Sequence, residues 1–124
     1  MNAVVETRHS KGVTILDVSG DVVLGDGTEA LRETVRGLVT GGIRRVVVNL
    51  AGVQHMDSSG IGELLATRTA LLNRGGQMKL LRPSRRVVEV LQITKIYNTF
   101  DIFEDEAAAL GSFRQIAADE ASAG

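Results

Sequence analysis

The sequence contains no cysteine, which excludes disulfide bonds, thiolate metal sites and catalysis by a cysteine nucleophile. Aromatic residues make up only 3% of the 124 residues, so the core must consist mainly of valine, leucine, isoleucine and alanine. Neither sign of charge dominates, since the formal net charge is -1. Nucleic-acid binding needs clustered positive charge, and we therefore expect no nucleic-acid partner.

Long apolar runs are also missing. No run approaches the roughly 18 residues that a membrane span requires, and the beginning of the sequence lacks the charged-then-apolar pattern of a signal peptide. These absences predict no membrane association and a cytoplasmic location. The length fits a single domain over residues 1–124, in which the small, polar residues 117–124 form a frayed tail.

What the sequence does contain is a regular alternation of apolar patterns. Strands are expected over residues 3–9, 13–18, 43–50, 78–81 and 100–103, and helices over 28–39, 59–73, 84–92 and 104–118. The turn at residues 10–12 joins the first two strands into an antiparallel hairpin, and Gly20-Asp21 ends the second strand. Asp26 or Thr28 is the expected cap of the first helix.

This order is β-β-α-β-α-β-α-β-α. It predicts an α/β domain with a mixed sheet of four to five strands, parallel after the hairpin, and about four helices. The uninterrupted apolar run Val46-Val47-Val48 is typical of a strand that is covered on both faces.

The most informative stretch follows that strand. The strand is expected to end at Leu50, and a short loop then leads to Asp-Ser-Ser-Gly-Ile-Gly at residues 57–62, which opens a helix. Asp57 or Ser58 would serve as the N-cap. Gly60 and Gly62 each cost roughly 1 kcal/mol in a helix interior, which indicates close approach by another backbone or a bulky group. A phosphate on Ser58 would lie beside the helix amides and would be repelled by Asp57.

The segment 56–62, Met-Asp-Ser-Ser-Gly-Ile-Gly, resembles the signature of the bacterial anti-sigma factor antagonists, which are STAS domains. The resemblance extends over roughly residues 4–110. It implies a STAS fold and a partner switch, in which the unphosphorylated antagonist binds an anti-sigma factor and frees a sigma factor. The anti-sigma factor has a histidine-kinase-like ATP-binding fold and phosphorylates the first serine after the aspartate. A serine phosphatase resets the switch, and the antagonist itself is not an enzyme.

Carried over to this sequence, the resemblance makes Ser58 the phosphoacceptor and implies no metal or cofactor. The residues expected to bind the partner are Asp21, Asp26, Met56, Asp57, Ser58, Ser59, Gly60 and Ile61. One departure concerns the loop after Gly20-Asp21, where many members carry a second acidic residue and this chain has Val23. Asp26 is the candidate replacement, in a loop that is one residue longer.

Three alternative functions, and a possible metal site, compete with this interpretation. A serine hydrolase would need a base, for which His55 lies three residues before Ser58, but the G-x-S-x-G pattern is missing. A nucleotide-binding enzyme lacks its glycine and lysine motifs, and two distant histidines make no metal site. The third alternative is a non-switching STAS scaffold or accessory subunit of a stress-sensing assembly or a transport system, and the intact Asp-Ser-Ser-Gly argues against it. An exposed sheet face or edge leaves room for a homodimer.

Overall fold

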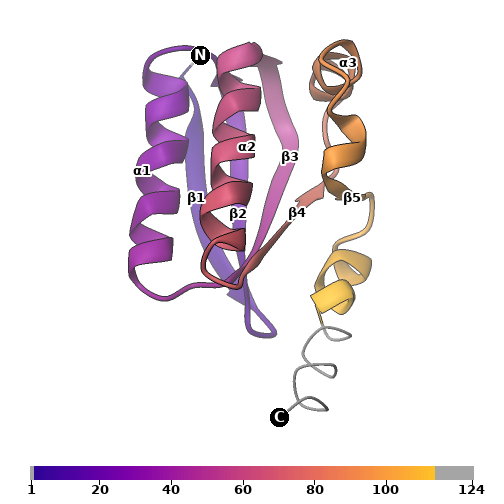
Figure 1. The fold of residues 1–124 in the computed structure, drawn as a ribbon. Coiled ribbons are helices and arrows are strands. Elements are labelled where there is room, and N and C mark those ends of the chain that lie inside the picture. The colour runs from indigo at the N-terminus through magenta and orange to yellow at the C-terminus, as the bar shows by residue number, and fades with distance from the viewer. Residues whose placement is uncertain (1, 114–124) are drawn as a thin grey trace.

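A computed structural model describes residues 2–113, which form one five-stranded sheet with helices on both faces (Figure 1). The elements in chain order are β1 (Val4–Ser10), β2 (Val13–Val22), α1 (Asp26–Thr40), β3 (Arg45–Met56), α2 (Ser58–Leu72), β4 (Gln77–Leu81), α3 (Arg85–Ile93), the 3-10 turn η1 (Tyr97–Thr99), β5 (Asp101–Phe103) and a final helix of which residues 106–113 are described. The strands lie in the order β1-β2-β3-β4-β5, antiparallel between β1 and β2 and parallel thereafter. The predicted fold class is confirmed.

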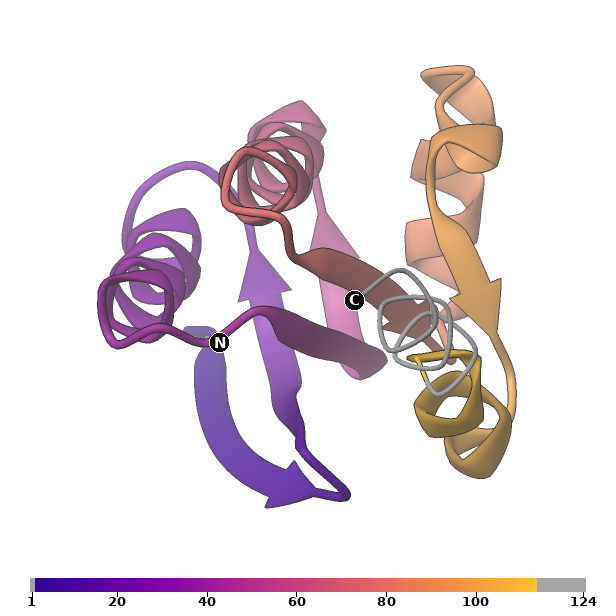
Figure 2. The same ribbon diagram turned by 60° about the horizontal axis from the view of Figure 1, so that its bottom comes forward.

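The helices divide unequally between the two faces of the sheet. The main hydrophobic core joins one face to α1, α2 and α3, through side chains such as Leu31, Leu64 and Leu91. Figure 1 shows α1 and α2 side by side across β1, β2 and β3. The opposite face has a smaller core, in which Leu110 and Phe113 of the final helix pack on the sheet. Figure 2 shows the final helix on the other side of the sheet from α1 and α2.

The valine run of β3 explains why both faces are apolar there. Val46 and Val48 point into the main core, and Val47 points into the smaller core, because successive side chains of a strand alternate between faces. All three are at most 2% exposed, which confirms the expected burial on both sides.

A charged cluster holds the final helix to the sheet. The Arg8 guanidinium of β1 donates to Asp17 of β2 at 2.7 Å and to Glu106 at 3.1 Å. These bonds from Arg8 lower the pKa of Asp17 and of Glu106, and Asn49 adds a further hydrogen bond to Asp17 at 2.9 Å. The cluster therefore connects β1, β2, β3 and the final helix.

The structure corrects three expectations from the sequence. β2 continues through Gly20-Asp21 to Val22, and β3 continues past Leu50 to Met56, so the expected short loop is strand. The two extensions pair with each other across register shifts, which is how bulged strands stay in a ladder. The N-cap of α1 is Gly25, and neither Asp26 nor Thr28 caps that helix. The predicted frayed tail over residues 117–124 lies outside the described residues.

Candidate functional site

The expected site lies where β2 and β3 end next to each other. Val22 pairs with Met56 at the carboxyl ends of these two parallel strands, and each strand leads within a few residues into a helix. Ligands of α/β sheets bind outside the carboxyl ends of parallel strands. The loop before α1 and the first turn of α2 therefore lie at the edge of the sheet where a site is expected.

Asp57 is the residue that joins these two segments. One carboxylate oxygen, Oδ1, accepts hydrogen bonds from the backbone N–H groups of Ser59 at 2.9 Å and Gly60 at 3.1 Å. The other, Oδ2, accepts from the N–H of Leu24 at 3.2 Å. Asp57 is thus the N-cap of α2, one of the two residues predicted for that role, and it also holds the loop between β2 and α1.

Ser58 is the first residue of α2 and is exposed. Within the described part of the chain its hydroxyl makes no hydrogen bond, so it is free to react or to bind. Ser59, the next residue, is half-buried. The two serines of the motif therefore differ in access, and the first is the one that a partner reaches more easily.

The two glycines of the motif have different surroundings. A β-carbon on Gly60 would fall against the carbonyl oxygen of Val22 and 2.7 Å from Cγ of Met56. A β-carbon on Gly62 would meet no atom within 4 Å. Gly60 therefore allows α2 to pack on the end of β2, as the expected close backbone approach requires, whereas Gly62 leaves open surface on the first turns of α2.

The acidic residues before α1 are placed differently from each other. Asp21 is half-buried, and its Oδ1 lies 2.8 Å from Nδ1 of His55. Asp26 is exposed at the first position of α1. His55 is thus engaged with Asp21, and no hydrogen bond among the described residues joins it to Ser58.

Met56 and Ile61 belong to the core. They are 7% and 3% exposed and pack with the other apolar side chains between the sheet and the helices. Ile61 was expected either at the partner surface or in the core, and Met56 at the partner surface. Their burial leaves little of either side chain at the surface of this domain, and partner contact by them stays a prediction. Gly60 is also buried, and its part is the packing of α2.

Leu24 lies at this site as an exposed side chain that the sequence pattern does not indicate. Its side chain is 78% exposed, although its backbone N–H is held by Asp57. Single exposed apolar side chains are common on protein surfaces, so it is the position of Leu24 beside Asp57, and not its exposure, that makes it a candidate contact residue. The sequence offers one weak signal, since this leucine precedes a glycine in the turn and belongs to no strand or helix pattern.

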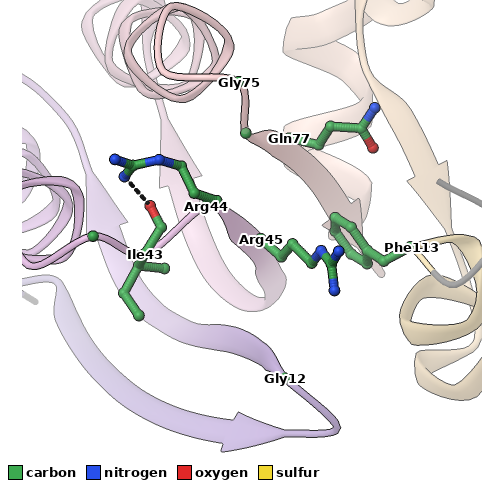
Figure 3. Close-up of a pocket in the computed structure, with 9 residues that line it drawn as sticks. Gly12, Ile43, Arg44, Arg45, Gly75, Gln77 and Phe113 are labelled. Carbon is green, nitrogen blue, oxygen red and sulfur yellow. Dashed lines mark hydrogen bonds between the residues drawn. The ribbon is translucent and has the colours of Figure 1, made fainter. Parts of the chain in front are cut away.

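Two other observations bear on the surroundings of this site. A hollow of about 390 Å³ lies at the amino ends of β3 and β4, between Arg44, Arg45, Gln77 and Phe113 (Figure 3). It is at the opposite end of the sheet from Ser58, which follows the carboxyl end of β3. No helix in the described part of the chain is long and apolar enough to cross a membrane.

The family model of the STAS domain matches residues 4–109. The chain belongs to the STAS domain family. The anti-sigma F factor antagonist of Paenibacillus polymyxa is 26% identical over 110 residues, which cover 89% of this chain and 94% of that protein.

Two solved structures share the fold. An anti-sigma factor antagonist from Mycobacterium paratuberculosis superposes with a TM-score of 0.78 at 21% identity, over 91% of this chain and 95% of its own. The Bacillus cell fate determinant SpoIIAA in its phosphorylated form gives a TM-score of 0.70 at 20% identity, over 89% of this chain and 99% of its own. The resemblance of residues 56–62 to the STAS signature thus agrees with the fold of the whole domain.

Proposed function

We propose that this STAS domain is an anti-sigma factor antagonist that is switched by phosphorylation of Ser58. In the unphosphorylated state it binds an anti-sigma factor and so frees a sigma factor. The observation that carries the proposal is the exposed Ser58 hydroxyl beside Asp57, whose carboxylate ties the first turn of α2 to the loop of Leu24. One modification at Ser58 would therefore act on both segments.

The binding surface consists of an apolar side chain within a polar rim. Leu24 supplies the exposed apolar group, and Ser58, Ser59 and Asp26 supply polar groups around the same end of the sheet. Gly62 has no side chain and faces open space, so a partner backbone can come close to α2 at that position. Interfaces derive most of their affinity from a few desolvated anchors, and Leu24 is the residue placed for that role.

Phosphorylation would change this surface in two ways. A phosphate adds about -1.5 to -2 charges to Ser58, which must be desolvated if the partner is to bind. The same charge repels the Asp57 carboxylate and competes with it for the N–H groups of Ser59 and Gly60. Because Asp57 also accepts from Leu24, displacing its carboxylate would release the loop that carries the apolar anchor.

The family and its relatives support the kind of partner that we propose. A relative is named for antagonism of an anti-sigma factor, and the family resemblance makes that partner a serine kinase with a histidine-kinase-like ATP-binding fold. A serine phosphatase would then restore the active form. On this proposal the chain is a cytoplasmic binding protein without catalytic activity of its own, and it needs no cofactor.

Titration of fluorescently labelled protein with the candidate anti-sigma factor tests the anchor. Leu24→Ser should weaken binding by about tenfold or more, because truncating a buried anchor commonly costs 1–2 kcal/mol. Ile93→Ser is the matched control, since Ile93 is also 78% exposed but lies at the end of α3. Equal losses in both variants would show that Leu24 has no special part in the interface.

The same titration tests the switch. Ser58→Ala should bind constitutively, and Ser58→Asp should bind more weakly, because it places a fixed negative charge next to Asp57. Circular dichroism of both variants checks that α2 and the sheet are intact. If Ser58→Ala and Ser58→Asp bind the partner equally well, the switch is refuted and a non-switching STAS scaffold or accessory subunit is the better description.

A further inference from the structure

A groove runs between α1 and α2 on the side that faces away from the sheet. It encloses about 250 Å³. Its floor and walls contain Val35 and Val39 of α1 and the small residues Ala66 and Ala70 of α2. Ala66 is exposed and Ala70 is half-buried, so the groove opens to solvent over an apolar floor.

The rim of this groove is basic. Three arginines, Arg32, Arg36 and Arg74, line it against a single carboxylate, Glu63. Arg32 donates to Glu63 at 2.9 Å, so that pair is internally neutralised. No ion pair or side-chain hydrogen bond among the described residues engages Arg36 or Arg74, which leaves two positive charges, one from each helix.

The acidic residues of α1 do not cancel these two charges within the groove. Glu29 and Glu33 line a neighbouring hollow on α1, which shares Arg32 and Arg36 with the groove. Neither glutamate lines the groove, and neither forms an ion pair with Arg36 within the described part of the chain. A ligand that enters from the α2 side therefore meets positive charge at both walls.

The shape of the groove narrows the kind of ligand. Its volume lies below the roughly 300–1,000 Å³ of typical small-molecule pockets, which favours a side chain presented by another protein. Both walls are helices whose backbone groups are already hydrogen-bonded, so no strand edge is available for an added strand. The remaining common mode of peptide recognition that suits two parallel walls is a third helix laid in the groove.

We propose that the α1–α2 groove binds an acidic amphipathic helix of a partner protein. An aliphatic side chain of that helix enters the hollow over Ala66 and Ala70, and its carboxylates pair with Arg36 and Arg74. Ala66 lies about 12 Å along the helix axis from Ser58, so this surface is separate from the switch. The proposal goes beyond the antagonist function, and binding here does not depend on the state of Ser58.

The test uses the full chain and a synthetic acidic helix of about 20 residues, long enough to be helical in isolation. Its leucines repeat at helical spacing along one face, glutamates occupy the other positions, and a fluorescent label reports binding by anisotropy. Arg36→Glu and Arg74→Glu should each weaken binding about five- to tenfold. Arg86→Glu is the matched control on α3 and should leave the affinity within about twofold, because Arg86 is equally free of ion pairs in the described residues but remote in the fold.

A second variant separates shape from charge. Ala66→Leu fills the hollow from an exposed position without changing the charge, and it should weaken binding about tenfold while circular dichroism shows an intact fold. A control peptide with serine in place of the leucines should bind at least about tenfold more weakly, because it has no apolar anchor.

Several results would overturn the proposal. These are no binding to the native chain at millimolar peptide, equal losses in the Arg86→Glu control, or equal binding of the serine peptide. Sedimentation of the protein alone tests the other possible occupant of the groove, a second copy of this chain. A dimer that Ala66→Leu abolishes would assign the groove to that second copy. Ser58→Asp should bind the peptide with unchanged affinity. Peptide binding therefore tests the groove separately from the Ser58 switch, and either proposal can fail without the other.

Discussion

The contrast between Gly60 and Gly62 gives a sharp test of how α2 is seated on the sheet. Both glycines lie in the first turns of the same helix, two residues apart. A methyl group on Gly60 would press on the Val22 carbonyl and on Met56, whereas one on Gly62 would point into open space. Substitution by alanine should therefore have opposite effects at the two positions.

The magnitudes follow from packing and helix propensity. Forcing an extra methyl into a filled space typically costs 1–3 kcal/mol, and at Gly60 the neighbour is backbone, which cannot move aside easily. We expect Gly60→Ala to lower the free energy of unfolding by about 1–3 kcal/mol. Gly62→Ala meets no obstacle and should raise it by about 0.5–1 kcal/mol, because alanine favours the helix more than glycine does.

Urea denaturation followed by far-ultraviolet circular dichroism measures both variants against the native chain. The midpoints should move in opposite directions, and thermal midpoints should differ by about 3–5 °C for each kcal/mol in a domain of this size. Gly62→Ala is the control for the generic effect of a helical methyl group. If both variants were stabilised to a similar extent, the close packing of α2 on Val22 would be wrong.

Two further predictions concern Asp57 and the charged cluster around Arg8. Asp57→Asn keeps a good N-cap, but its side-chain NH2 group would face the backbone N–H of Leu24, which then loses its acceptor. The backbone N–H of Leu24 should therefore exchange hydrogen faster, while the urea midpoint changes little. Unchanged exchange at Leu24 would contradict the link between the loop and the helix. Arg8 lowers the pKa of Asp17 and Glu106, so their contribution to stability is present above their unfolded pKa values near 4 and is lost as the pH falls through the folded ones. Urea midpoints should therefore drop below about pH 4, and Arg8→Met should flatten that drop.

The strand and helix order was predictable because apolar periodicity is strong in this chain. The extension of β3 beyond Leu50 was not, because Ala51, Gly52, Gln54 and His55 are small or polar and have the composition of a loop. They remain in a strand because β2 pairs with them across a bulge, including Asp21 opposite His55. Pairing across the sheet is a tertiary effect that a local pattern does not encode.

The place of the candidate site in the fold was predictable from the sequence, but the surface around it was less so. Asp57 and Ser58 lie where the motif places them, since a cap and its helix are local features. Met56 and Ile61 belong to the core, because apolar residues flanking a strand-to-helix turn pack on either side of it. Leu24 was missed because its exposure depends on how the loop before α1 is held by Asp57, which is 33 residues away.

The proposed switch depends most directly on modification of Ser58. The protein is incubated with ATP and a candidate anti-sigma kinase. Intact-mass spectrometry with site mapping follows the phosphorylation over time, and the fraction of protein in the complex is measured in parallel. We expect a single phosphate, on Ser58 and not on the half-buried Ser59, with the complex dissociating as the phosphate appears. A complex that persists with Ser58 fully phosphorylated, or a phosphate on Ser59 in its place, would contradict the proposed switch.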